Sequence, residues 1–239
     1  MVWDTAEEVR GAIRNGVPYK LKEAKSFKRE ISYLKNFGKN NIKSKFKKIW
    51  FLQCIKIIEQ SVAYNQNIYG YYYRDKCIAE NLLWIMKTSK KSSKIVVWAH
   101  NEHIKKTDNA MGAYLSEKLK QHYLSIGFSV NTGTYTARHL KATKLSFYNL
   151  RPSYPGTYEY YFHLVKIPIF LIDFRKLDLK SKESQWLRKE HYFRVAGAFF
   201  YPSTEFSKQK ILEEFDMFIF IDKSSHSKVL HRHKFYKLN

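Results

Sequence analysis

Short apolar runs that alternate with helical stretches after residue 93 most constrain the fold of this 239-residue chain. The run at 94–99 (KIVVWA) is short, continuous and largely apolar, which is typical of a strand buried on both faces of a sheet. Further strands are predicted at 127–130, 168–174, 195–201 and 215–222. Helices are predicted at 111–125, 157–165, 183–191 and 205–214. This alternation predicts an α/β fold with a largely parallel sheet flanked by helices.

The first third of the chain is predicted to be helical instead. Helices are expected at 3–15 and 74–87, and one or two long basic helices at 20–63. Gly38 or the pair Asn40-Asn41 gives the expected break within 20–63. Because no repeat or low-complexity linker interrupts the sequence, we predict one domain over 1–239, with 20–63 as a basic helical segment inside it.

The net charge is +22, from 43 Lys plus Arg against 21 Asp plus Glu. The densest cluster of basic residues runs from Lys20 to Lys48, yet it carries no nucleic-acid fold motif. Lysine outnumbers arginine 33 to 10, whereas base reading favours arginine. Lysine together with abundant Ile, Asn, Phe and Tyr also fits a genome rich in A and T. A solvated basic surface therefore explains the charge better than a nucleic-acid partner, which stays the weaker alternative.

No stretch approaches the roughly 18 apolar residues of a membrane helix, and the opening MVWDTAEEVR is acidic where a secretory signal would be basic. We therefore expect a cytoplasmic protein with no membrane partner. Cys54 and Cys77 stand in no CxxC pattern, and we expect both to be buried in helices rather than catalytic.

Two histidines, His100 and His103, directly follow the predicted strand at 94–99. Ligands of open α/β sheets bind beyond the carboxyl ends of strands, so these imidazoles could act as acid or base, polarise a carbonyl or bind a metal. The plainer alternative is that one caps a turn and the other is solvated. A zinc site would need further ligands, such as His163 or His191, and the spacing is not that of HExxH. We predict no metal and no cofactor.

Several motifs taken in order make the chain similar to a known family. They are RDKCIAENLLWIM, KIVVWAHNEHI, AMGAYLSEKL and YLSIGF, followed by PGTYEYYFH, FLIDFR, RVAGAFFYP and FDMFIFID. In this order, from Tyr73 to Asp222, they resemble the erythromycin esterase family. VWDTAEEV near the start resembles a helix of the same family.

The resemblance implies hydrolysis of carboxylic esters, including the macrolactone of erythromycin and hence macrolide antibiotic resistance. It implies attack by water activated by a histidine base, with no acyl-enzyme and no metal. In the family that base lies in a Gly-Glu-x-x-His segment after the first strand, and this sequence contains no such segment. We therefore expect a domain truncated at its amino terminus, lacking its first strand or strands and inactive or poorly active alone.

Residue roles carry over from the resemblance motif by motif. His100 would orient or polarise the ester carbonyl, Arg74 would hold carboxylates or the oxyanion, and His103 is a weaker catalytic match. The remaining matched positions are candidate substrate-binding residues: Asn101, Glu159 and His163. The expected partner is a small-molecule ester, with self-association through an exposed sheet edge. A non-catalytic remnant that binds a partner or ligand through the same cleft is the second hypothesis.

Overall fold

A computed structural model describes residues 24–65, 72–139, 145–200 and 205–228. It divides into two compact units, Met1–Lys94 (unit 1) and Ile95–Asn239 (unit 2), and each is described by itself. The single domain expected over 1–239 stays a prediction. The helix expected at 3–15 lies outside the described residues.

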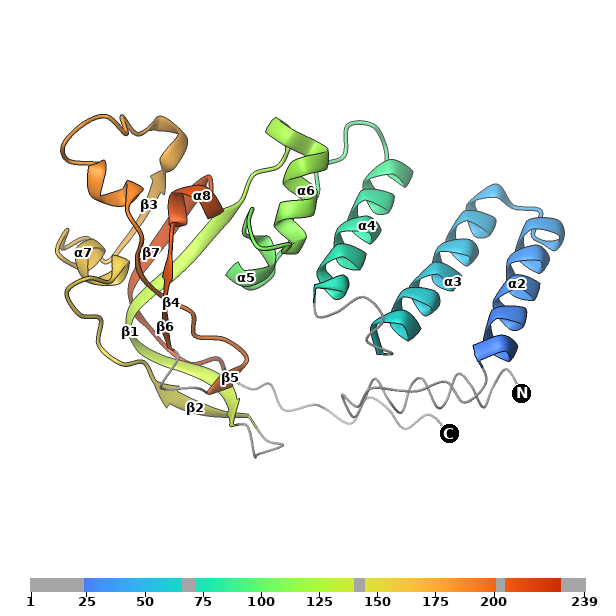
Figure 1. Cartoon of the computed structure of the whole chain (residues 1–239), viewed down its shortest axis with the longest axis horizontal. Helices are drawn as coiled ribbons and strands as arrows, with labels where there is room; N and C mark the ends of the chain where they lie inside the picture. The colour runs from blue at the N-terminus through green and yellow to red at the C-terminus, as the bar shows by residue number, and fades with distance from the viewer. Residues whose placement is uncertain (1–23, 66–71, 140–144, 201–204, 229–239) are drawn as a thin grey trace. The chain divides into compact units, whose positions relative to one another are not determined.

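Three helices make up the described part of unit 1: α2 (Ala24–Asn41), α3 (Lys45–Asn65) and α4 (Tyr73–Thr88), each beside the next (Figure 1). The break expected near Asn40-Asn41 is confirmed, and so is the helix expected at 74–87. Gly38 lies inside α2, where an added Cβ would come within 2.5 Å of the Phe51 ring. This glycine therefore allows close helix packing and does not end the helix.

Polar side chains join α3 to α4. Gln53 Nε2 donates to Asn81 Oδ1 at 2.8 Å, and Asn81 Nδ2 donates to Gln60 Oε1 at 3.1 Å. Cys77 on α4 is buried, as expected, whereas Cys54 on α3 is exposed, so that expectation was wrong. Among the described residues, no helix is both long and apolar enough to cross a membrane.

Unit 2 contains a mixed sheet in the order β2-β1-β7-β3. Its strands are β1 (Ile126–His139), β2 (Leu145–Asn149), β3 (Ile169–Asp173) and β7 (Met217–Ser224), with β5 (Phe199–Phe200) paired to the end of β1. Strand β1 is parallel to β7 and β5, whereas β2 and β3 join as antiparallel edges. The α/β class is confirmed, with a parallel pair at the centre of the sheet.

The core of unit 2 lies between one face of this sheet and helix α7 (Tyr158–His163), which packs on β1, β4 and β7 (Figure 1). Phe218 and Phe220 alternate along β7 and are fully buried against Phe162, as a strand with one core face requires. A second small sheet pairs β4 (His191–Arg194) with β6 (Phe206–Gln209).

Several predicted elements differ from the structure. The helix expected at 183–191 is the short 3₁₀ helix η3 (Gln185–Arg188), after which β4 begins, and within 195–200 only β5 is a strand. The helix expected at 205–214 is strand β6 followed by the single helical turn α8 (Ile211–Glu214), because β6 pairs with β4, which local sequence does not reveal. The stretch 94–99 forms neither a helix nor a strand and pairs with no described strand. Its side chains at Val96 and Trp98 are 92% and 84% exposed, although its composition is that of a buried strand.

Candidate functional site

The histidine that follows the 94–99 segment begins a one-turn helix, α5 (Asn101–Ile104). His100 is its N-cap: the ring Nδ1 accepts from the Glu102 amide at 3.3 Å. The other ring nitrogen, Nε2, lies 2.9 Å from the carbonyl oxygen of Ala196. A carbonyl only accepts, so this geometry fits the neutral tautomer with its proton on Nε2. His100 is therefore arranged as a hydrogen-bond donor, and its Nδ1 is not free to act as a base.

Asn101 fixes the same turn to the sheet. Its Nδ2 donates to the Phe128 carbonyl at 2.6 Å, and its Oδ1 accepts from the Phe128 amide at 3.1 Å. The side chain thus binds both backbone groups of one β1 residue, as a neighbouring strand would. Asn101 therefore positions the turn, and its expected contact with substrate stays a prediction.

Two hydrogen bonds to the last carbonyl of α5 hold the end of the turn. Ile104 O accepts from Tyr123 Oη at 2.7 Å and from Ser125 Oγ at 2.8 Å. Burial raises the pKa of Tyr123 to about 12, so the phenol remains a donor at neutral pH. Helix α6 (Met111–Leu119) approaches so closely at Gly112 that an added Cβ would lie 2.1 Å from Ile104 O.

A buried ammonium follows immediately. Only 8% of the Lys105 side chain is exposed, and its Nζ lies 2.8 Å from both Glu102 Oε2 and Asp108 Oδ2. Burial opposes this charge, but hydrogen bonds to the two carboxylates outweigh burial and raise the pKa of Lys105. Burial, with neighbouring carboxylates, raises the pKa of Glu214 to about 7, although Lys105 opposes the shift. Gln209 on β6 completes the group by donating to Glu102 Oε1 at 3.3 Å.

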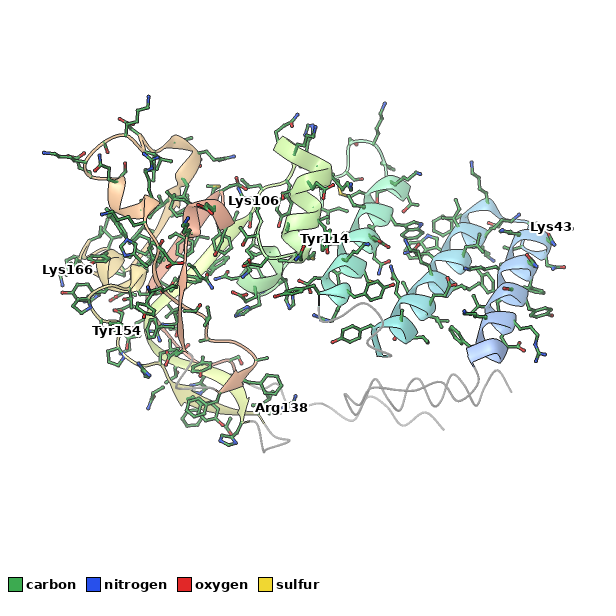
Figure 2. All side chains as sticks on the ribbon, viewed as in Figure 1. Lys43, Lys106, Tyr114, Arg138, Tyr154 and Lys166 are labelled. Atoms are coloured by element: carbon green, nitrogen blue, oxygen red, sulfur yellow. The ribbon has the colours of Figure 1, made fainter. Side chains whose placement is uncertain are left out.

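Neighbouring Lys106, labelled in Figure 2, lies between α6 and α8. Its backbone amide donates to Glu214 O at 2.9 Å, and its Nζ is 2.7 Å from Asp216 Oδ1. Asp216 Oδ2 in turn accepts from the Ser125 amide at 2.9 Å. The loop after α5 is therefore joined to α8 and to the start of β1.

Glu159, on α7, is fully buried. Its Oε1 accepts from Ser129 Oγ and, at 2.9 Å, from the Arg194 amide. Burial raises the pKa of Glu159, although these hydrogen bonds oppose the rise. With no exposed surface, the carboxyl is placed to support β1 and β4. Its expected contact with substrate stays a prediction.

Arg194, at the end of β4, links several strands and loops. Its Nε donates to Val130 O at 2.8 Å, its Nη2 donates to Asn131 O and Arg151 O at 2.7 Å, and its Nη1 pairs with Glu205. Burial lowers the pKa of Arg194 to about 10, which leaves it charged at neutral pH. Since the Arg194 amide bonds Glu159 and the Ala196 carbonyl bonds His100, residues 194–196 connect these two side chains.

His163 belongs to a separate pair. Its Nδ1 lies 2.6 Å from Asp222 Oδ1 on β7, and the same oxygen accepts from Asn131 Nδ2 at 2.8 Å. Burial opposes ionisation of Asp222, but hydrogen bonds from Asn131 and His163 outweigh it and lower the pKa of this carboxyl. The imidazole is about one-third exposed, at the carboxyl end of the parallel pair β1–β7.

The structure thus brings His100, Asn101 and half-buried His103 onto one turn and connects Glu159 to it. Arg74 is the second residue of α4 in unit 1 and is half exposed, with Nη1 3.9 Å from Asp75 Oδ1. Sequence reasoning missed Lys105 and Arg194. The spacing Glu102-x-x-Lys105-x-x-Asp108 was a local signal for the first, whereas Arg194 had none. In the described part of the chain, no three His, Cys, Asp or Glu residues gather in a way that could hold a metal ion.

Comparison with known families tests the resemblance directly. The profile of the family described as erythromycin esterase matches residues 5–224. The chain belongs to the erythromycin esterase family. It is also similar to YbfO of Bacillus subtilis (strain 168), which bears the name of a hydrolase, at 32% identity over 89 residues; the match covers 31% of this chain and 20% of YbfO.

Solved structures share the fold. A Bacillus cereus protein is similar with a TM-score of 0.72 and 27% identity, over 83% of this chain and 51% of its own. A succinoglycan biosynthesis protein is similar with a TM-score of 0.67 and 22% identity, over 83% of this chain and 48% of its own. A histidine-to-asparagine mutant of the erythromycin esterase EreC, in its open conformation, is similar with a TM-score of 0.60 and 16% identity. This match covers 82% of this chain and 51% of the EreC chain. The chain spans about half of each solved relative.

Proposed function

We propose that this chain provides the carbonyl-polarising part of an esterase site that hydrolyses small-molecule carboxylic esters, with macrolactones among the candidate substrates. Membership in the erythromycin esterase family supports the reaction class. The geometry of His100 supports the role: a neutral imidazole offers its Nε2 proton to a carbonyl, here that of Ala196. A substrate carbonyl that replaces Ala196 O would be polarised in the same way.

The general base is proposed to come from the family's Gly-Glu-x-x-His segment, which does not occur in these 239 residues. Neither nitrogen of His100 is available for that task, because Nδ1 accepts from the Glu102 amide and Nε2 carries the proton. Loss of a general base costs about 10²–10⁴ in rate. The 239 residues alone are therefore expected to hydrolyse esters slowly or not at all.

The exposed segment at 95–99 is the observation that carries this proposal. Val96 and Trp98 are almost fully exposed, immediately before a turn that is fixed to β1. Apolar side chains of a strand normally lie against neighbours on a sheet. We infer that a further strand with the base-bearing segment packs here and completes the site beside His100.

Ester hydrolysis by His100→Ala and by the matched control His122→Ala tests the proposal. His122 lies in the short 3₁₀ helix η1 (Lys120–His122) and is exposed. Both variants are assayed on erythromycin and on simple aryl esters, with every in-frame codon upstream of Met1 included. We expect kcat/KM to fall about 100-fold for His100→Ala, as for loss of one oxyanion donor. For the control His122→Ala, kcat/KM should stay unchanged. Equal activity of the two variants would overturn the assignment.

A non-catalytic remnant is the second candidate, favoured by the absence of the base segment from this sequence. It predicts no turnover of any ester even with upstream codons included. It also predicts ligand binding that depends on His100, measurable by calorimetry. Turnover above the uncatalysed rate would exclude it.

Self-association is proposed to use the edge of β3. This strand pairs only with β7 among the described residues, and its Ile169 and Leu171 side chains are 65% and 50% exposed. Apolar edge strands readily pair with a second copy, and the one charged residue of β3, Asp173 at its end, is paired with Arg175. Sedimentation should show a dimer that Leu171→Lys abolishes. A monomer at every concentration for the parent chain would refute this route.

A further inference from the structure

The ammonium of Lys105 is the only described lysine nitrogen that is buried and bonded to two carboxylates. One of them, Glu102, lies inside the turn α5, and the other, Asp108, lies in the loop that follows. Glu102 also accepts from Gln209 of β6. Lys105 thus joins the turn that begins with His100 to the loop that follows, and Glu102 joins the same turn to β6.

The loop is built to bring Asp108 to this position. Asp108 and Asn109 both have left-handed backbones, with φ of 56° and 55°, which Asp and Asn tolerate better than most residues. Without the ammonium, Glu102, Asp108 and buried Glu214 would form an uncompensated acidic group, because Glu214 interacts electrostatically with both of the other carboxylates. Their repulsion would act on Glu102, whose amide donates to the capping ring of His100.

We propose that Lys105 is a positioning residue for the esterase site: by holding Glu102 against Asp108, it fixes the α5 turn and therefore the tautomer and direction of His100. The inference deepens the proposed function and rests on it for its biological meaning. Its physical content concerns only the contacts of the turn, so it can be tested whether or not the chain hydrolyses an ester.

Two backbone amides report directly on the docking of the turn. The Glu102 amide donates to His100 Nδ1, and the Phe128 amide donates to Asn101 Oδ1. The Asp222 amide, which donates to Pro168 O at 2.8 Å between β7 and β3, reports on the sheet. A ratio of exchange rates between the first two amides and the third separates release of the turn from general unfolding.

The experiment compares Lys105→Met with Lys118→Met in the full chain. Lys118 also contacts a carboxylate, Glu117, at 2.7 Å, but this pair is largely exposed. We expect Lys105→Met to raise hydrogen exchange of the Glu102 and Phe128 amides about tenfold relative to Asp222, while Lys118→Met leaves the ratio unchanged. In the ¹⁵N spectrum, the parent should show His100 protonated on Nε2, and Lys105→Met should show averaging between tautomers.

A second variant keeps the test decisive if Lys105→Met does not fold. Asp108→Asn removes one carboxylate, and asparagine tolerates the left-handed backbone conformation of this position. It should raise the same ratio by a smaller factor and shift the His100 nitrogens in the same direction. The proposal is overturned if the folded variants keep both the exchange ratio and the parent ¹⁵N signature. Loss of ester hydrolysis in His100→Ala tests the proposed function separately.

Discussion

Replacing Glu214 by glutamine is expected to stabilise unit 2 at pH 8 and to leave its stability unchanged in acid. The Glu214 carboxyl is 5% exposed, and one of its oxygens has no hydrogen-bond partner. Burial first, and then nearby carboxylates, raise its pKa from 4.5 to about 7, although Lys105 opposes the rise. The folded protein therefore resists ionisation of this group more strongly than the unfolded chain does.

The sign follows from proton binding. Between pH 4.5 and 7 the folded state holds a proton that the unfolded state has released, so stability falls as pH rises through this window. The full contribution is present below pH 4.5 and lost above pH 7. A difference of about 2.5 pKa units corresponds to about 3 kcal/mol. Glu214→Gln cannot ionise, and its amide can donate to neighbouring carboxylates, so it avoids this loss.

Urea unfolding at pH 5, 6, 7 and 8 measures the effect. The stability difference between Glu214→Gln and the parent should grow from about 0.8 kcal/mol at pH 5 to about 3 kcal/mol at pH 8. Glu213→Gln is the matched control, because Glu213 is exposed and pairs with Lys210 at 3.3 Å. It should change stability by less than about 0.5 kcal/mol at every pH. A constant difference for Glu214→Gln across this pH range would refute the argument.

Three further substitutions test how the turn and its support are held. Gly112→Ala places a Cβ against a backbone carbonyl of α5 and should cost about 1–3 kcal/mol in thermal unfolding. Asn101→Asp keeps an acceptor for the Phe128 amide but loses the donor to its carbonyl, so we expect a loss of about 1–3 kcal/mol and faster exchange of that amide. Arg194→Met leaves Glu205 buried without its ion-pair partner, with the Arg151 amide as a remaining donor, which should cost about 3–5 kcal/mol in urea unfolding unless the carboxyl becomes protonated.

Local sequence patterns predicted much of unit 2, because the hydrophobic pattern within many of its elements indicates their type. Strand β7 alternates core and outer residues, and β3 is a short apolar run, so both were found from sequence. The helix expected at 205–214 was wrong because a strand paired with β4 and a single turn can imitate one helix when read locally. The two-histidine turn was also found, since it follows an apolar run.

Electrostatic contacts between residues far apart in the sequence could not be predicted from local sequence patterns. Glu102, Lys105 and Asp108 are three residues apart and could have been read as a cluster, but Glu214 joins them from more than a hundred residues away. The same is true of Arg194, which meets Val130 and Asn131 across the fold. Contacts of this kind depend on how strands are ordered, and their physical cost is visible only once burial is known.

The short helix α5 shows how these contacts bear on function. Four residues are too few to form a helix alone, since nucleation is unfavourable without tertiary contacts. Here the turn is held by hydrogen bonds of Asn101 to β1, by Lys105 and by bonds to the Ile104 carbonyl. The segment before it exposes Val96 and Trp98. One side of His100 is thus fixed and the other is open. If a further strand completes the open side, we expect His100 to receive it with little movement, because its Nε2 proton and backbone are already oriented.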